Sequence, residues 1–314
     1  MDTRQLGTDG PFLTEIGLGT WAIGGPWDWG WGKQNDEDSI EAIQRALELG
    51  INWIDTAAVY GLGHAEEIVA KAIEGRRDNV FIATKCGLVW DENGNVTNNI
   101  RPESIRKEAE ASLRRLKTDR IDLYQIHWPD PNASISRAWE TMVKLQEEEK
   151  VRYIGVSNFN VPQLKQCLKI ASVQSLQPPY HLLRREIEAE ILPFCRENGI
   201  GVVVYSPMAS GLLTGKFDPN RLAPDDWRHK VSDFREPKLS KILAFVEKLR
   251  PIAERHGKTV GNLAVAWTLR NPGVTAAIVG ARNVQQVEEN IGAAGWHLTE
   301  EEVQEIESLL QEEL

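Results

Sequence analysis

The chain has 314 residues, which is long for a single β-sandwich but within the range of one large α/β domain. Hydrophobic residues make up 41% and charged residues 26%, enough for a buried core and a hydrated surface. The net charge of −10 argues against nucleic acid or an anionic membrane as a general partner, and no stretch approaches the ~20 apolar residues of a membrane span.

The beginning of the chain predicts a hairpin, a strand and a long loop. Glycines and a proline between residues 5 and 13 are typical of a hairpin turn. A short apolar run then predicts a strand at 16–19. The segment 20–35 that follows is dense in glycine and tryptophan, which indicates a loop.

From residue 36 on, short apolar runs alternate with segments whose apolar residues recur at helical spacing. Asp36 begins one such segment, in which Ile40, Ile43 and Leu47 fall on one face of a helix. The runs that predict buried strands are, in order, 53–55, 80–85, 121–126, 153–156, 175–177, 201–205 and 276–279.

These elements amount to eight strands, each followed by helix, which predicts a parallel sheet. Eight units fit an α/β fold of the closed (β/α)8 TIM-barrel type, with an N-terminal β-hairpin and extra helices near the C-terminus. The helices of that last part are expected at 187–196, 239–256 and 260–269, after the cap residue Asn283, and over 299–314. The alternative is an open doubly wound sheet, but no Gly-x-Gly-x-x-Gly follows an early strand. We expect residues 1–314 to form a single domain.

Three successive predicted strands end on ionisable residues, namely Asp55, Lys85 and His127, and Tyr60 follows just after the first. In a barrel the carboxyl ends of the strands meet at one face, so these side chains would converge. A carboxylate at the end of a core strand is costly unless a positive charge meets it, and Lys85 could supply that charge. Taken singly, the residues could be a structural ion pair, a packed ring and a core histidine; taken together they favour a functional site.

A series of motifs at the strand ends resembles the aldo-keto reductases over nearly the whole chain. The motifs are Gly17-Leu18-Gly19-Thr20, Asp55-Thr56-Ala57 with Tyr60-Gly61, Thr84-Lys85, Ile121-Asp122-Leu123-Tyr124 with His127, Gly155-Val156-Ser157-Asn158-Phe159, Tyr205-Ser206-Pro207, and Gly280 with Glu289-Asn290. The segment Gly211-Leu212-Leu213-Thr214-Gly215-Lys216 is most similar to the bacterial reductases related to potassium-channel β subunits. The resemblance implies a (β/α)8 barrel with NADP(H) as its cofactor.

The resemblance also implies catalytic roles for Asp55, Tyr60, Lys85 and His127. Tyr60 would protonate a carbonyl oxygen while a nicotinamide supplies the hydride, which no side chain can donate. Tyrosine titrates near ~10 in water. We expect the ammonium of Lys85, held by Asp55, to lower the pKa of Tyr60. His127 would orient and polarise the carbonyl.

Cofactor-binding residues follow from the same resemblance. Ser157, Asn158 and Gln177 would bond the carboxamide. Tyr205 would stack on the nicotinamide ring. A helix start after the last strand, together with the guanidinium of Arg282, suits the 2′-phosphate of NADP. The residues expected at the cofactor are Thr20, Trp21, Asp55, Ser157, Asn158, Gln177, Tyr205, Ser206, Pro207, Met208, Ala209, Gly211, Lys216, Arg228, Gly280, Arg282, Gln286, Glu289 and Asn290.

Tryptophans mark the expected substrate pocket. Trp27, Trp29 and Trp31 lie at alternate positions in the first loop, so an extended chain would present all three rings on one side. We expect Trp27, Trp29, Trp90 and Trp128 to bind substrate, because each follows a strand end at the same face. The alternative is that these rings only plug the rim of the barrel.

The sequence therefore predicts an NADPH-dependent oxidoreductase that reduces aldehyde or ketone carbonyls of small molecules to alcohols. The alternative is an NADP-binding regulatory or redox-sensing subunit with little turnover. No histidine has metal-ligand spacing, so no metal is expected. Three cysteines without Cys-x-x-Cys, and no apolar signal-peptide run in residues 1–10, lead us to expect a cytoplasmic protein. Cys86 is expected to be a buried packing thiol.

Overall fold

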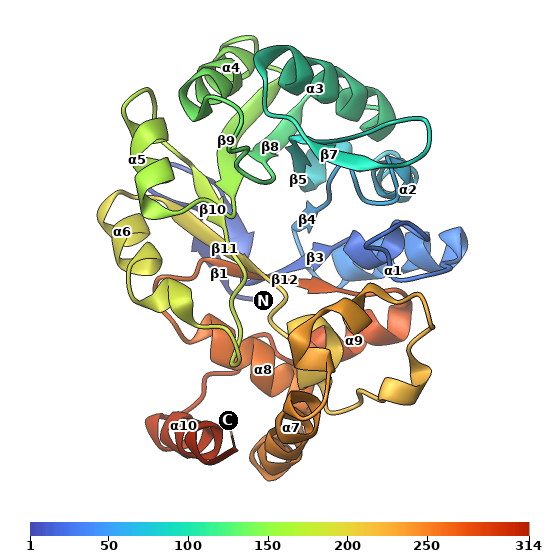
Figure 1. Ribbon diagram of the computed structural model, residues 1–314, viewed down its shortest axis with the longest axis vertical. Coiled ribbons are helices and arrows are strands. Elements are labelled where there is room, and N and C mark those ends of the chain that lie inside the picture. Colours follow the sequence, from blue (N-terminus) through green and yellow to red (C-terminus); the bar gives the residue numbers. More distant parts are fainter. Residues whose placement is uncertain (314) are drawn as a thin grey trace.

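A computed structural model describes residues 1–313 and contains a closed barrel of parallel strands surrounded by helices (Figure 1). The barrel strands are β3 (Ile16–Gly19), β4 (Trp53–Asp55), β5 (Phe81–Cys86), β8 (Ile121–Ile126), β9 (Val151–Ser157), β10 (Ser175–Gln177), β11 (Gly201–Tyr205) and β12 (Ala276–Gly280). Strand β12 pairs with β3, and β9 with β10, which closes the ring. The predicted TIM-barrel fold is therefore confirmed.

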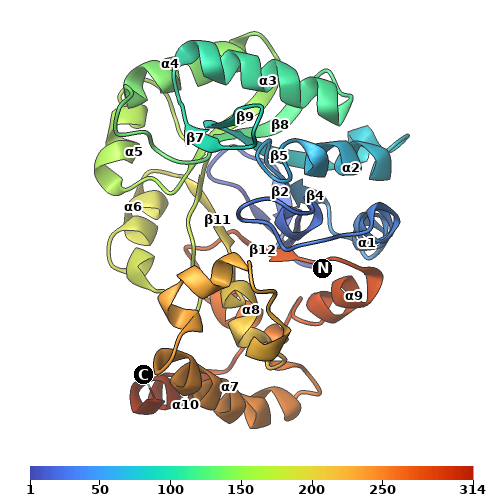
Figure 2. The ribbon, with the colours of Figure 1, turned by 45° about the vertical axis from the view of Figure 1, so that its right-hand side comes forward.

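Helices cover the outside of the barrel (Figure 1). They are α1 (Asp36–Glu48), α2 (His64–Ala72), α3 (Pro102–Leu116), α4 (Ile135–Glu147), α5 (Val161–Leu168), α6 (Ile191–Glu197), α7 (Lys238–Glu254), α8 (Val260–Leu269), α9 (Val284–Ile291) and α10 (Glu300–Glu313). Helices α7 and α10, drawn in orange and red in Figure 2, pack against each other as the expected extra elements near the C-terminus.

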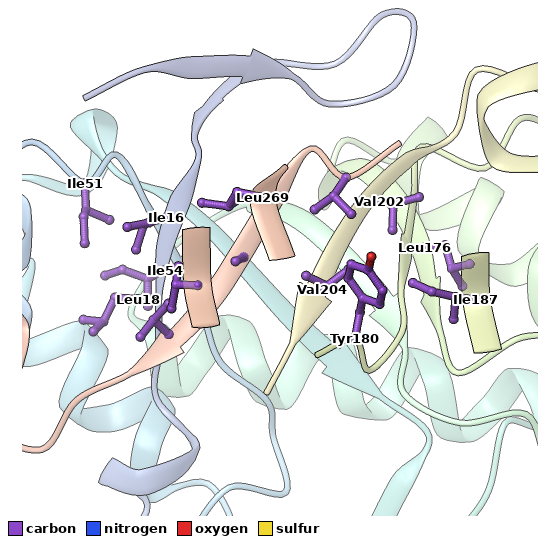
Figure 3. Close-up of a cluster of buried hydrophobic side chains, with 14 of the residues drawn as sticks. Ile16, Leu18, Ile51, Ile54, Leu176, Tyr180, Ile187, Val202, Val204 and Leu269 are labelled. Atoms are coloured by element: carbon purple, nitrogen blue, oxygen red, sulfur yellow. The ribbon is translucent and has the colours of Figure 1, made fainter. Parts of the chain in front are cut away.

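Side chains alternate along each strand between the barrel interior and the helix layer. On β4, Trp53 and Asp55 belong to the interior, whereas Ile54 packs in the outer hydrophobic core. Figure 3 shows part of that outer core, to which strand and helix residues of distant sequence segments contribute. This alternation explains why a core strand can end with a polar side chain that points into the barrel.

The amino ends of the barrel strands are filled by side chains. The antiparallel hairpin of β1 (Thr3–Gln5) and β2 (Phe12–Thr14) contributes Leu6 and Leu13 to an inner cluster with Trp53. The Trp53 ring also occupies the space beside Gly17, where a Cβ would lie 2.1 Å from ring atoms. The interior is therefore packed at this end.

Three segments differ from the sequence expectation. After the strand that ends near Lys85 the sequence, with its Asn93-Gly94 turn, predicts a loop; the structure instead forms an antiparallel hairpin, β6 (Leu88–Trp90) with β7 (Val96–Asn98). The polar composition of residues 211–236 predicts a long loop, but in the structure this region contains short 3-10 turns, including η4 (Ala209–Thr214) and η6 (Trp227–Lys230). The helix expected at 187–196 divides into a 3-10 turn, Glu186–Glu188, and α6.

Candidate active site

A cavity of about 950 Å³ lies at the carboxyl ends of the barrel strands. Aromatic and aliphatic side chains line it around Tyr60 and His127, and polar groups of the segments 205–216 and 280–290 line it elsewhere. Asp55 and Gln177 also line it, although they are almost fully buried. The strand ends that the sequence singled out are thus brought to one cavity.

Lys85 is held by three hydrogen bonds that use all three of its N–H donors. Its Nζ donates to Asp55 Oδ1 at 2.6 Å, to the carbonyl oxygen of Thr56 at 2.8 Å and to the hydroxyl of Tyr60 at 3.3 Å. Lys85 and Asp55 are 1% and 2% exposed. Since the Tyr60 oxygen accepts from Lys85, the phenolic proton is left to point to another acceptor.

His127 stands beside Tyr60 at the aromatic side of the cavity. The two rings meet edge to face with centroids 5.9 Å apart, and the Trp27 ring lies 6.5 Å from Tyr60 on another side. The backbone of His127 is fixed by bonds from its N–H to Cys86 and from the Asn158 amide to its carbonyl oxygen. The imidazole is thus placed next to the phenolic hydroxyl.

The pKa of Tyr60 differs from our expectation. Burial, with the Asp55 carboxylate as a second cause, raises the pKa of Tyr60 well above its ordinary value, so the expected lowering by Lys85 is wrong for this structure. Burial also lowers the pKa of Lys85, against the opposing effect of Asp55. Burial and the nearby Lys85 charge lower the pKa of His127 well below its ordinary value. Tyr60 is therefore a neutral hydroxyl and His127 a neutral imidazole around pH 7.

A chain of amide and hydroxyl groups connects the ion pair to the next strands. Gln177 Nε2 donates to Asp55 Oδ2 at 2.8 Å, and the Ser157 hydroxyl donates to the backbone oxygen of Gln177 at 2.7 Å. Asn158 donates to Ser157 at 3.0 Å and accepts from the Tyr205 hydroxyl at 2.8 Å. All four expected residues on these strand ends line the cavity.

The loop after β11 approaches the cavity with an unusual backbone. Ser206, Ala209, Ser210 and Gly211 have φ values of 55°, 49°, 53° and 103°, in the left-handed region that only glycine adopts without cost. Among the expected residues of this loop, those that line the cavity are Ser206, Pro207, Met208, Gly211 and Lys216. Ala209 does not line it, because its side chain packs into the outer core.

Two arginines mark the polar side of the cavity. Arg282 donates from Nε to Gln34 Oε1 at 2.7 Å and from Nη2 to the carbonyl oxygen of Lys33, so both partners are neutral. Arg228 is paired with Asp226 at 2.7 Å. Burial, and secondarily the charge of Arg228, lowers the pKa of Arg282. Arg282 thus faces the cavity with a charge that these bonds leave uncompensated.

The remaining expected cofactor residues cluster near Arg282. Lys216 pairs with Glu289 at 2.7 Å, and Asn290 donates to the carbonyl oxygen of Gly280 at 3.0 Å. Gln286, at the start of α9, accepts from the backbone N–H of Arg282 at 2.8 Å. All of these residues line the cavity, as does Trp21. Thr20 does not, because it is fully buried and its hydroxyl donates to the carbonyl oxygen of Asp55.

The tryptophan loop is folded rather than extended. Gly30 bonds back to Trp27, and the Trp21 indole donates to the carbonyl oxygen of Trp29, so the expected one-sided row is wrong in its geometry. Trp27, Trp29 and Trp31 nevertheless all line the cavity, as does Trp128. Trp90 does not line it; the guanidinium carbon of Arg115 lies 5.8 Å from the centre of the Trp90 ring.

Several lining residues were missed from the sequence. They include Leu88 and Val96 of the β6–β7 hairpin, Val59, Gln285, and Thr259, Gly261 and Asn262 around the start of α8. The Trp227 ring, also missed, packs against Trp21 at 5.3 Å and against Trp31 at 6.1 Å. Only Asn93-Gly94, a typical hairpin turn, could have signalled the hairpin beforehand.

Other chemical groups play no visible part in the cavity. Burial raises the pKa of the Cys86 thiol well above its ordinary value, which opposes thiolate chemistry there. Among residues 1–313, no group of three or more His, Cys, Asp or Glu side chains could hold a metal ion. Within the same range, no helix is long and apolar enough to cross a membrane.

Comparisons with known proteins agree with this geometry. The model of the Aldo/keto reductase family matches residues 15–311. The chain is 41% identical to an aldo-keto reductase of Bacillus subtilis over 99% of this chain and 94% of that protein. It is 37% identical to the NADH-specific methylglyoxal reductase of Escherichia coli, over 96% and 95% of the two chains. The structure of a glycerol dehydrogenase from Gluconobacter oxydans matches with a TM-score of 0.91 and 40% identity, over 100% of this chain and 96% of that one. A barrel whose strand ends gather these motifs in one cavity, with relatives along its full length, belongs to the aldo/keto reductase family.

Proposed function

We propose that this enzyme reduces aldehyde or ketone carbonyls to alcohols with NADPH, and that Tyr60 is its general acid. The observation that carries the proposal is the bond from Lys85 to the Tyr60 oxygen at 3.3 Å. Because that oxygen accepts, its own proton is available to a carbonyl oxygen in the cavity. The raised pKa of Tyr60 supports the same role, since an acid must be protonated before it can donate.

Lys85 and His127 would assist Tyr60 in different ways. The Lys85 ammonium, fixed by Asp55 and Thr56, would stabilise negative charge that develops on the phenolic oxygen as its proton leaves. His127, kept neutral by burial, carries one N–H that can donate to the carbonyl oxygen and hold it beside Tyr60. The edge-to-face contact of the Tyr60 and His127 rings supports this shared target.

The cavity beyond Tyr60 fits a nicotinamide dinucleotide, whose nicotinamide supplies the hydride when it is bound. Ser157, Asn158 and Gln177 carry amide and hydroxyl groups suited to a carboxamide, and Tyr205 offers a ring face. The left-handed loop 206–211 and Lys216 would accommodate the pyrophosphate. Gln286, Glu289 and Asn290 would contact the adenosine portion.

Arg282 is the reason for proposing NADPH rather than NADH. Its hydrogen-bond partners are neutral, so its charge can pair with a 2′-phosphate and no existing ion pair with a carboxylate has to be broken first. Arg228 is a weaker candidate, because Asp226 already neutralises it. The Escherichia coli relative is NADH-specific, so membership of the family does not decide the cofactor.

Three further properties belong to this proposal: a single domain, a cytoplasmic location and small carbonyl substrates. Strands β3 and β12, from opposite ends of the sequence, pair side by side, which supports one domain over residues 1–314. The three cysteines are all free and buried, which supports the reducing environment of the cytoplasm. The rings and aliphatic side chains around Tyr60 support small uncharged carbonyl compounds as substrates.

The test is to follow NADPH oxidation with a panel of aldehydes and ketones, using wild type and Tyr60→Phe. We expect turnover by wild type and a fall in kcat of ~100-fold or more in the variant, with little change in NADPH binding. Tyr153→Phe is the control, since Tyr153 of β9 packs against Phe81 of β5 and does not line the cavity. Tight NADPH binding without turnover on any carbonyl would instead favour the regulatory subunit.

A further inference from the structure

An ion pair with a fully buried carboxylate and a partly buried arginine lies behind Lys85, between the barrel and its helix layer. Thr84, the residue before Lys85 on β5, donates its hydroxyl proton to Glu66 Oε1 at 2.6 Å. The second oxygen of Glu66 accepts from Arg115 Nε, also at 2.6 Å. Glu66, on α2, is 0% exposed and lies outside the cavity lining. The pair is therefore not used by the proposed chemistry directly.

Glu66 belongs to the turn of chain that carries Tyr60. The Ala65 N–H donates to the carbonyl oxygen of Tyr60 at 3.1 Å, which ties the start of α2 to the tyrosine. Gly63 turns the chain between them with a φ of 105°. A Cβ at Gly63 would lie 2.8 Å from the Arg115 side chain, so Arg115 packs directly on this turn.

Arg115 also reaches the hairpin that lines the other side of the cavity. The Trp90 ring of β6 lies 5.8 Å from the guanidinium carbon of Arg115, within the range of a cation–π contact. Leu88 and Val96 of the same hairpin line the cavity. One arginine thus contacts the Tyr60 turn, the Glu66 carboxylate and the hairpin.

We propose that Glu66, held by Arg115, is a positioning residue for the contact between Tyr60 and Lys85; this inference rests on the proposed function. The bond from Thr84 to Glu66 joins the strand that carries Lys85 to the helix start that is bonded to Tyr60. It therefore fixes the distance between the two catalytic groups from outside the barrel. The Lys85–Tyr60 bond, at 3.3 Å, is the longest of the three that Lys85 makes, so a small displacement of the turn would break it first.

Charge and position can be separated experimentally at this site. The titratable groups that surround Lys85 are Asp55 from β4, Tyr60, Glu66 from α2 and His127 after β8. The Glu66 charge favours the ammonium form of Lys85, so removing Glu66 would change charge and position together. Thr84→Val replaces the hydroxyl with a methyl group and keeps both charges of the Glu66–Arg115 pair. It is therefore the variant that tests positioning.

The closing experiment compares kcat of Thr84→Val in two backgrounds. In wild type we expect kcat to fall about tenfold, with NADPH binding unchanged, because a catalytic group displaced by less than an ångström loses rate. Thr84→Ser, which keeps the hydroxyl, should restore kcat. In Tyr60→Phe the same Thr84→Val change should alter the residual rate by less than about twofold, because the effect acts through Tyr60. Thr141→Val is the matched control, since Thr141 is a buried threonine on α4 that bonds its own helix.

Hydrogen exchange at the Ala65 amide gives a readout that does not need activity. Thr84→Val should speed this exchange, and Thr141→Val should leave it unchanged. If wild type is active and Thr84→Val has the same kcat, the positioning role is overturned while the proposed function stands. The same holds if Thr84→Val lowers kcat by an equal factor in wild type and in Tyr60→Phe. A wild type without turnover would overturn the proposed function. In that case faster Ala65 exchange in Thr84→Val still supports the positioning role, and unchanged exchange overturns it.

Discussion

Glu108 makes the stability of this barrel depend on pH near neutrality. Its side chain lies on α3 and is 8% exposed, and it accepts from the Gly87 N–H at 2.9 Å and from the Ser104 hydroxyl at 3.1 Å. Burial raises the pKa of Glu108 from 4.5 to about 7, against these two hydrogen bonds and the charge of Arg115. The folded protein therefore binds a proton that the unfolded chain has already lost at neutral pH.

The size and sign of the effect follow from linkage. Below pH 4.5 both states are protonated, so Glu108 costs no stability. Between pH 4.5 and about 7 the unfolded chain loses its proton while the folded protein keeps it, so stability falls as pH rises through the folded pKa, and above it the loss is complete. A shift of the Glu108 pKa from 4.5 to about 7, at about 1.4 kcal/mol per pKa unit, lowers the free energy of unfolding by about 3 kcal/mol at alkaline pH. With an unfolding entropy of about 2.1 cal/mol/K per residue, this corresponds to roughly 5 °C in Tm.

Glu108→Gln isolates this effect, because the amide keeps the shape of the side chain and cannot ionise. We expect the Tm of Glu108→Gln, measured by circular dichroism relative to wild type, to rise by roughly 5 °C between about pH 4 and about pH 8.5. Glu103→Gln, at an exposed position on the same helix, should show no pH-dependent gain in Tm. A constant difference between Glu108→Gln and wild type at the two pH values would refute the reasoning.

Three further predictions concern the cavity. Arg282→Ala should weaken NADPH binding roughly ten- to a hundredfold and leave NADH binding nearly unchanged in titrations, because a charged hydrogen bond contributes about 1.5–3 kcal/mol; equal losses would mean that Arg282 contacts a shared part of both cofactors. Trp27→Ala should raise KM for aromatic aldehydes more than for small aliphatic ones, because only the larger substrates lose a ring contact; an unchanged ranking with a large fall in Tm would support the rim-plug alternative. The pH profile of kcat/KM should be flat around 6.5, because the lowered pKa of His127 keeps it neutral there; a limb at that pH, absent in His127→Gln, would contradict the assignment.

The barrel could be predicted because its strands are short, buried apolar runs with turns between them. The β6–β7 hairpin could not, since its two strands have three residues each and are only partly buried, so they carry no apolar periodicity. The turn Asn93-Gly94 was taken for an irregular loop although it is also typical of a hairpin. The 3-10 turns between residues 209 and 234 were missed because such short turns depend on tertiary packing.

The candidate site was predicted well where strand ends place residues and poorly where environment or loop conformation decides. Asp55, Lys85 and His127 meet because each ends a neighbouring strand of one barrel. The direction of the Tyr60 pKa shift was wrong, because the depth of burial around a ring cannot be read from the sequence. Trp90 does not line the cavity, because its ring packs on the Arg115 guanidinium of α3, a contact between distant segments that the sequence does not reveal.

The distribution of tryptophan gives the protein a built-in optical signal. Five of the eleven indoles line the cavity, namely Trp21, Trp27, Trp29, Trp31 and Trp128. Trp53, Trp139 and Trp267 are fully buried and lie outside the cavity lining, so their environment stays constant when the cavity is occupied. Entry of any molecule into the cavity therefore changes the polarity around nearly half of the emitting rings and leaves the others as an internal reference. Occupancy can be followed by intrinsic fluorescence in the unlabelled protein, even for compounds that are not turned over.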